Sequence, residues 1–262
     1  MARIAVGLEY DGTAFAGWQS QPGLRTVQAL AEQALSRIAA VPLALTCAGR
    51  TDAGVHALGQ VAHFDTQATR SARSWMLGAN SELPADVSVR WAQEVPEHFH
   101  ARYSAQSRTY RYLILNRGGR SALWRDRAAW VHRPLDVTAM AQAAQLLEGE
   151  HDFSAFRAAE CQAKSPVRRL ERLQVVRAAE LVRIEATANA FLHHMVRNIA
   201  GLLLAIGRGE APPGWAGEVL AGRDRTRAAA TAPAHGLYLL RVRYPEAFAF
   251  PEPPEAAPGG AG

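Results

Sequence analysis

The sequence predicts an α/β or α+β protein built from two halves of similar size. Three observations lead to this fold class. Apolar residues alternate along residues 3–10, apolar residues recur at helical spacing along residues 27–38, and similar strand and helix patterns return in the second half of the 262-residue chain. An apolar content of 48% is sufficient for a buried core. One sequence does not determine how the strands pair.

The first half opens with a predicted strand at residues 3–10. Every second residue there is apolar, which is typical of a strand covered on one side. Thr26 is in a position to cap the helix that follows and ends before Pro42. Further strands in this half are expected at residues 61–64 and 87–91.

The second half of the chain also combines strand and helix patterns. Asp136 is expected to cap a helix that runs through Leu147 and stops at Gly149. Strands are expected at residues 110–115, 173–176 and 182–186, and a helix at residues 191–206. We therefore expect an N-terminal α/β domain over residues 1–102, a C-terminal α/β domain over residues 103–246 and a disordered tail over residues 247–262, which are rich in Pro and Gly.

Composition limits the classes of function. The longest apolar run, near residues 199–206, is far shorter than the roughly 20 residues that cross a bilayer, so no membrane association is expected. The first residues form a strand pattern without the apolar core of a signal peptide, which favours the cytoplasm. The two cysteines, Cys47 and Cys161, have no spacing typical of a metal site or a disulfide framework.

Positive charge gathers in one segment of a chain whose net charge is +5. Residues 102–133 contain eight arginines and only one acid, Asp126. Five aromatic residues are interspersed among the arginines: Tyr103, Tyr110, Tyr112, Trp124 and Trp130. Arginine neutralises phosphates and aromatic rings stack on exposed bases, so this mixture suits unpaired RNA. A bias toward arginine is the alternative explanation, since Lys164 is the only lysine.

The segment GRTDAGVHA at residues 49–57 is predicted to be a loop that displays Asp52. Gly49 and Gly54 allow tight turns on both sides of the carboxylate, and a strand follows closely. The alternative is that Asp52 is an ordinary turn residue that accepts backbone N–H groups.

Arg197 is the only charge on a helix that is apolar all round, which indicates a buried helix. A buried guanidinium needs a carboxylate or a cleft, and no acid lies at helical spacing from it. Asp52 is a candidate partner, since a nearby cation would keep a carboxylate ionised. Otherwise Arg197 reaches past the helix end into solvent.

Five blocks of sequence, in order, resemble the tRNA pseudouridine synthase A family. They are EYDGTAFAGWQSQP at residues 9–22, GRTDAGVHA at 49–57, SRTYRYLILN at 107–116, FLHHMVRNIAG at 191–201 and HGLYL at 235–239. The resemblance implies two α/β halves, each with an antiparallel sheet, joined into one extended sheet with helices packed on it and a basic cleft between the halves. It also implies a homodimer and an isomerase that converts uridines 38, 39 and 40 of the tRNA anticodon stem-loop into pseudouridine.

The resemblance assigns roles to five residues. Asp52 becomes the catalytic carboxylate and Arg197 its partner, Tyr110 stacks on the target base, Arg50 contacts the RNA backbone and assists base flipping, and Leu237 lines the uracil pocket. The block at 191–201 has His193 where the family favours tyrosine, so the role of His193 is open.

The chemistry fits these residue types. Breaking the N-glycosidic bond, turning uracil and rejoining it through carbon needs no oxidation and no transferred group, so neither cofactor nor metal is expected. An ionised carboxylate can attack the uracil ring or the ribose, or deprotonate the sugar, once the base has left its stack.

Two other functions compete with this one. A metal-dependent RNA hydrolase would use Asp52 with His56 and His63, or His98 with His100, as ligands. His193 and His194 are a weaker ligand pair, because neighbours on a helix point about 100° apart. An RNA-binding module without chemistry would leave Asp52 as a turn residue.

Overall fold

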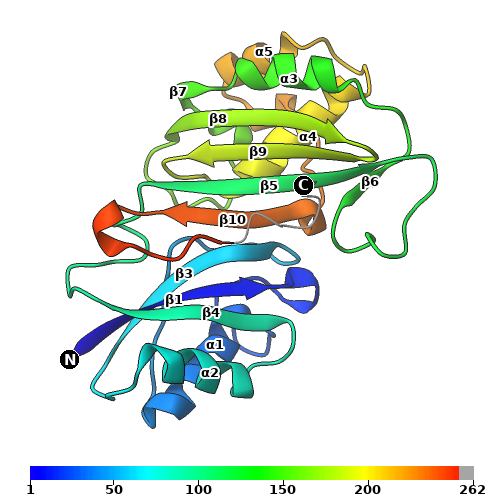
Figure 1. Ribbon diagram of the computed structural model, residues 1–262. Helices are drawn as coiled ribbons and strands as arrows, with labels where there is room; N and C mark the ends of the chain where they lie inside the picture. The colour runs from blue at the N-terminus through cyan, green and yellow to red at the C-terminus, as the bar shows by residue number, and fades with distance from the viewer. Residues whose placement is uncertain (254–262) are drawn as a thin grey trace. The chain divides into compact units, whose positions relative to one another are not determined.

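The structure is a computed structural model that describes residues 1–253 in two units (Figure 1). Of these residues, unit 1 holds Met1–Gln106 together with residues 238–253, and unit 2 holds Ser107–Leu237. Each unit combines a mostly antiparallel sheet with helices, which confirms the predicted mixed fold class. Within the described range, no helix is both long enough and apolar enough to span a bilayer.

The division along the chain differs from the expected one. The first break falls at residues 106/107 in place of 102/103, and residues 238–253 return to unit 1. The return is made by one strand, β10 (Leu237–Arg243), which pairs in parallel with a strand of unit 1 so that Tyr238 lies opposite His56. A pairing between residues this far apart in sequence leaves no local signal.

The sheet of unit 1 has the strand order β4-β1-β3-β10. Antiparallel pairing joins β1 (Ala2–Tyr10) to both β3 (His56–Thr66) and β4 (Val87–Val95), and the short β2 (Thr46–Cys47) pairs with β3. The three longer strands contain the strands predicted from residues 3–10, 61–64 and 87–91. Each extends beyond the apolar run that predicted it.

Helices α1 (Val27–Ala39) and α2 (Ala72–Glu82) pack on each other, and α2 packs on β4. Thr26 precedes α1 as predicted, but its buried hydroxyl has no hydrogen-bond partner among the described residues. The N-terminal N–H groups of Val27 and Gln28 instead donate to the carbonyl oxygens of Gly17 and Trp18. The loop before α1 therefore caps the helix through its backbone.

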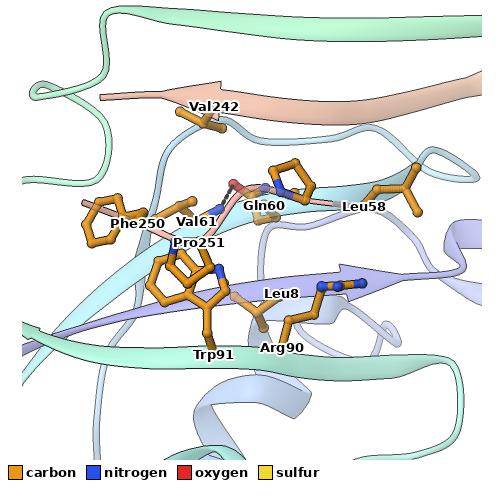
Figure 2. Close-up of a pocket in the computed structure, with 12 residues that line it drawn as sticks. Leu8, Leu58, Gln60, Val61, Arg90, Trp91, Val242, Phe250 and Pro251 are labelled. Carbon is orange, nitrogen blue, oxygen red and sulfur yellow. Dashed lines mark hydrogen bonds between the residues drawn. The ribbon is translucent and has the colours of Figure 1, made fainter. Parts of the chain in front are cut away.

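The strand β1 is covered on both faces, so the expectation of a strand exposed on one side is wrong. Ala5, on the second face, is fully buried in a cluster that includes Phe248 and the partly buried Phe250. Figure 2 shows Phe250 and Pro251 next to Trp91, and the rings of Trp91 and Phe250 stack with centroids 4.9 Å apart. The expected disorder from residue 247 therefore fails for residues 247–253, while the rest of that expectation lies outside the described residues.

The sheet of unit 2 has the order β5-β9-β8-β7. Antiparallel pairs join β5 (Ser107–Asn116), β9 (Leu181–Ala188), β8 (Val167–Ala178) and β7 (Gly149–Asp152) in that order, and β6 (Ala129–Val131) pairs in parallel with β5. The predicted strands at 110–115, 173–176 and 182–186 all lie within these elements.

Three helices belong to unit 2: α3 (Val137–Gln145), α4 (Met195–Gly207) and α5 (Trp215–Gly222). Packing joins α3 to β8 and to α4. Asp136 caps α3 as predicted, since its side chain accepts the N–H of Ala139. The chain then enters β7 at Gly149, with φ of 112°.

Short 3-10 turns complete the described chain. They are η1 (Gly12–Ala14), η2 (Ser154–Phe156), η3 (Arg225–Arg227), η4 (Ala234–Gly236) and η5 (Glu246–Phe248). Two of them are near candidate residues: η1 adjoins the segment that carries Asp52, and η4 precedes Leu237.

Candidate active site

The loop that carries Asp52 lies between β2 and β3 in unit 1 and is held by its backbone. The N–H of Trp18 donates to the carbonyl oxygen of Thr51 at 2.9 Å, and the N–H of Gly54 donates to that of Phe15 at 3.3 Å. The side-chain amide of Gln60 donates to the Gly49 carbonyl at 2.7 Å. These three hydrogen bonds fix the loop on the segment before α1 and on β3.

Asp52 itself sits at the start of a tight turn. Its carbonyl oxygen accepts the N–H of Val55 at 3.1 Å, and Gly54 has φ of 76°, in the left-handed region that glycine tolerates. Gly49, which was expected to make a similar turn, does not adopt a positive φ. The side chain of Asp52 is half-buried and that of Arg50 is exposed, so the loop displays both residues.

Two distant sequence blocks meet beneath this loop. The hydroxyls of Tyr10 and Thr51 are 2.7 Å apart in a buried hydrogen bond. Gly17, with φ of 99°, passes so close that a Cβ atom there would lie 2.8 Å from the Thr51 carbonyl oxygen. The block at residues 9–22 therefore supports the block at 49–57, a relation that the sequence order does not reveal.

Two of the histidines considered as metal ligands, His56 and His63, accept backbone N–H groups. Nδ1 of His56 accepts the N–H of Gly12 at 3.0 Å and lies 3.2 Å from a carboxylate oxygen of Asp11, and the ring stacks on Tyr238 at 4.6 Å. Nδ1 of His63 accepts the N–H of Ala101 at 3.2 Å. An acceptor role for Nδ1 explains both residues as buried, satisfied side chains.

In unit 2, Tyr110 lies on β5 and is 8% exposed. Its ring packs edge-on against Phe191, with centroids 5.1 Å apart and an interplanar angle of 85°. Tyr112, two residues along the strand and on the same face, donates its hydroxyl to the carbonyl of Pro233 at 2.8 Å. Burial raises the pKa of Tyr112 above its usual range, against the opposing charge of Arg197, so the hydroxyl stays a donor.

Arg197 occupies the first turn of α4, and every other residue of this helix is buried, as its apolar sequence predicts. Nε of Arg197 donates to the carbonyl oxygen of Ala232 at 2.9 Å, while the N–H of Ala232 donates to the carbonyl oxygen of Arg197 at 3.1 Å. A backbone segment thus contacts the guanidinium, a partner that the sequence analysis missed because it weighed a carboxylate, a cleft or solvent and no backbone carbonyl.

Leu237 follows the 3-10 turn η4 and is 5% exposed. The turn lies against β5, since a Cβ on Gly236 would be 2.8 Å from the ring of Tyr112 and from the carbonyl oxygen of Leu113. The same segment carries His235. Burial and the charge of Arg197 lower its pKa overall, although Asp126 opposes this shift. Unit 2 therefore groups Arg197, Tyr112 and the segment that ends at Leu237.

His193 and His194 precede α4, so the geometric reason for discounting them as a pair is wrong. The helix begins at Met195 because His194 adopts φ of 61°, and the two rings lie 4.1 Å apart. The backbone N–H of His193 donates to Sγ of Cys161 at 3.4 Å. This contact gives Cys161 a local role that its spacing in sequence did not suggest.

The predicted site residues are thus divided between the units. Asp52 and Arg50 share one loop of unit 1, and Tyr110, Arg197 and Leu237 belong to unit 2. The pairing of Asp52 with Arg197 stays a prediction. Sequence reasoning missed the supporting residues Tyr10 and Thr51, although both lie in the blocks that carry the family resemblance.

The family model described as tRNA pseudouridine synthase matches residues 8–104 and 143–245 of this chain. The matched ranges contain four of the five candidate residues: Asp52, Arg50, Arg197 and Leu237. Tyr110 falls in the unmatched stretch between them, so its role depends on the local sequence block and on the structure.

Curated relatives span nearly the whole chain. A tRNA pseudouridine synthase A from Methylococcus capsulatus is 60% identical over 246 residues, covering 94% of this chain and 91% of the relative. Those from Nitrosococcus oceani and Alcanivorax borkumensis are 57% and 55% identical, and each alignment covers at least 95% of both chains. A chain of a solved Cbf5-Nop10-Gar1 complex aligns at 13% identity with a TM-score of 0.35, covering 77% of this chain and 45% of that one, too weak a likeness to support any conclusion.

Proposed function

Because the chain belongs to the tRNA pseudouridine synthase family, and is therefore an isomerase that acts on tRNA, we propose that it converts uridines 38, 39 and 40 of the anticodon stem-loop into pseudouridine. The observation that carries the proposal is the rigid loop of unit 1, which displays Asp52 half-buried beside an exposed Arg50. We further propose that the enzyme acts in the cytoplasm, as a homodimer and without metal or cofactor.

Asp52 is the reacting group in this proposal. The carboxylate attacks the uracil ring or the ribose, or removes a proton from the sugar, and the glycosidic bond then breaks. Uracil turns and rejoins the ribose through a ring carbon, which then gives up its proton, while the ring nitrogen that left the ribose gains one, and the carboxylate is regenerated. No atom enters or leaves overall, so one carboxylate is sufficient for the cycle.

The other residues bind and orient the flipped nucleotide. Arg50, exposed next to Asp52, contacts the RNA backbone and helps hold the target nucleotide out of its stack. Tyr110 stacks on the target uracil, and Leu237 supplies an apolar wall that limits escape of the detached base. Arg197, held by Ala232, is proposed to pair with Asp52 and keep it ionised.

The direct test uses unmodified tRNA transcripts with uridines at positions 38, 39 and 40. We expect pseudouridine at these positions and none in matched transcripts that carry cytidine there. Modification at other uridines alone would contradict the proposed specificity, and no pseudouridine in any transcript would contradict the proposed activity.

The role of Asp52 is tested with Asp52→Asn. This variant should bind tRNA with the parent's Kd and form no pseudouridine, because the amide cannot act as a nucleophile or base. Asp65→Asn is the matched control, since Asp65 is paired with Arg3 in unit 1 and should leave the rate unchanged. An active Asp52→Asn variant would leave only RNA binding as the interpretation of this loop.

Arg197→Lys separates charge from geometry. Lysine keeps the charge but lacks the Nε–H that donates to Ala232, so kcat should fall about tenfold or more while the Kd for tRNA changes little. Arg208→Lys, at the other end of α4, is the control because Arg208 pairs with Glu210 at the surface. Equal kcat for both variants would remove Arg197 from the proposed site.

A further inference from the structure

Tyr103 is the most exposed aromatic side chain among the large hydrophobic residues of the described chain, with 77% of its surface open to solvent. It belongs to the segment in which arginines alternate with aromatic residues. The structure separates these aromatic residues by exposure: Tyr110 and Tyr112 are buried, and Trp130, 46% exposed, uses its indole N–H to bind the Arg117 carbonyl. Tyr103 alone among these four keeps most of its surface exposed.

The backbone around Tyr103 is fixed. Residues 100–104 form a turn in which the N–H of Ser104 donates to the carbonyl of His100, and the N–H of His100 donates to the hydroxyl of Ser104, both at 2.9 Å. Ala101, fully buried, donates its N–H to His63 and accepts the hydroxyl of Tyr244 at 2.6 Å. The backbone turn that carries the exposed ring is therefore held by hydrogen bonds to the core of unit 1.

The ring of Tyr103 is supported by a neighbour. The centroid of His100 lies 4.3 Å away with an interplanar angle of 30°. Nδ1 of His100 accepts the N–H groups of Arg102 and Tyr103, each at 3.2 Å, which requires an unprotonated ring nitrogen. Burial and the charges of Arg3 and Arg102 lower the pKa of His100, so its ring is neutral near pH 7.

Positive charge flanks this ring. The guanidinium carbon of Arg102 lies 5.8 Å from the Tyr103 centroid. Burial raises the pKa of the Cys47 thiol to about 12, and the charges of Arg50 and Arg102 both oppose that rise. Both guanidinium groups act on the Cys47 thiol. The turn that carries Tyr103 and the loop that carries Arg50 therefore both adjoin the part of unit 1 around Cys47.

We propose that Tyr103 is a stacking platform for an unpaired base of the RNA substrate, with Arg102 beside it as a phosphate contact. An exposed ring with a rigid backing loses little conformational freedom when a base stacks on it. The cationic neighbours favour a polyanion over a protein partner. The proposal rests on the tRNA substrate of the proposed function, and it assigns Tyr103 to binding and not to the chemical step.

The test measures Kd for a tRNA transcript, together with kcat and KM for pseudouridine formation. Stacking of one base predicts that Tyr103→Ala raises Kd and KM by roughly five- to hundredfold and leaves kcat at saturating tRNA unchanged. Tyr103→Phe should restore the parent values, and Tyr103→Leu, apolar but without an aromatic face, should not. Thermal melting of each variant checks that the fold is intact.

Two further measurements separate stacking from charge. Tyr103→Ala should leave the slope of log Kd against log salt unchanged, while Arg102→Gln should reduce that slope by about 1. Binding of a fully paired RNA duplex of equal length should not respond to Tyr103→Ala, because its bases are already stacked.

If Tyr103→Ala has the same Kd and KM as the parent, the proposed stacking role of Tyr103 is wrong. Pseudouridine formation by the parent would in that case still support the proposed function. A Tyr103→Phe variant as weak as Tyr103→Ala would also overturn the stacking role, since the hydroxyl would then be the binding group. If the parent neither binds nor modifies tRNA, the proposed function fails and the platform fails with it.

Discussion

The hydroxyl of Tyr10, at the end of the first strand, lies 2.7 Å from the hydroxyl of Thr51, the residue before the candidate catalytic carboxylate. Both residues are buried, at 4% and 7% exposure, and the side-chain amide of Gln60 donates to the same Tyr10 oxygen at 3.4 Å. The loop therefore rests on a polar contact inside the core, where an unmade hydrogen bond is costly.

This contact predicts energetic coupling between Tyr10 and Thr51. Tyr10→Phe and Thr51→Val should each lower the free energy of unfolding by about 1 kcal/mol, and the double variant should cost less than the sum of the two. Urea denaturation of the four proteins in the cycle measures the coupling. Strictly additive losses would mean that the contact contributes nothing to the loop's stability.

Gly17 predicts a second effect on the same loop. Its φ of 99° and its approach to the Thr51 carbonyl mean that Gly17→Ala should cost roughly 2–3 kcal/mol and lower kcat. Gly23→Ala is the matched control, because Gly23 has φ of 74° but nothing within 4 Å of the added Cβ. It should cost about 1 kcal/mol and leave kcat unchanged. Equal effects on stability and rate would show that the close approach is unimportant.

His63 predicts that unit 1 loses stability in mild acid. Burial and the charges of Arg3 and His100 lower its pKa from 6.5 to about 4, with Asp65 opposing. Between these two values the unfolded chain binds the proton that the folded chain excludes, so the free energy of unfolding falls as pH falls from 6.5 to 4, by up to about 3 kcal/mol.

Denaturation across this pH range checks the prediction for His63. His63→Asn keeps an acceptor for the Ala101 N–H but does not titrate, so its unfolding free energy should vary less with pH. The same pH dependence in parent and variant would assign the effect to other groups.

Phe248 predicts that the segment after β10 is part of the core. It is 8% exposed and packs on Phe99, with ring centroids 4.9 Å apart. Phe248→Ala should lower the free energy of unfolding by about 3 kcal/mol, whereas Leu123→Ala, at a side chain 86% exposed, should change it by less than about 0.5 kcal/mol. A small effect of Phe248→Ala in thermal or urea melts would mean that this segment does not contribute to the core of unit 1.

The sequence by itself determined the elements whose periodicity is strong and local. The strand at residues 3–10, the helix α1, the capped start of α3 and the apolar helix α4 all follow from side-chain spacing within one element. It missed α2, where Trp75 and Ala79 are the only buried residues and the apolar pattern is correspondingly weak. The family resemblance likewise came from short blocks, so Asp52 was found without the fold.

Only the tertiary structure decided the contacts between distant segments. Three examples are the return of the chain through β10, the burial of Phe248 on the second face of β1, and the hydrogen bond between Tyr10 and Thr51. They join residues that are between 41 and 243 positions apart in the sequence. Such contacts are specified by packing and hydrogen bonding in three dimensions, which one-dimensional periodicity does not encode. The same reason explains one contact of Arg197, in which its Nε donates to the carbonyl oxygen of Ala232, a backbone atom that every residue carries and no sequence pattern marks.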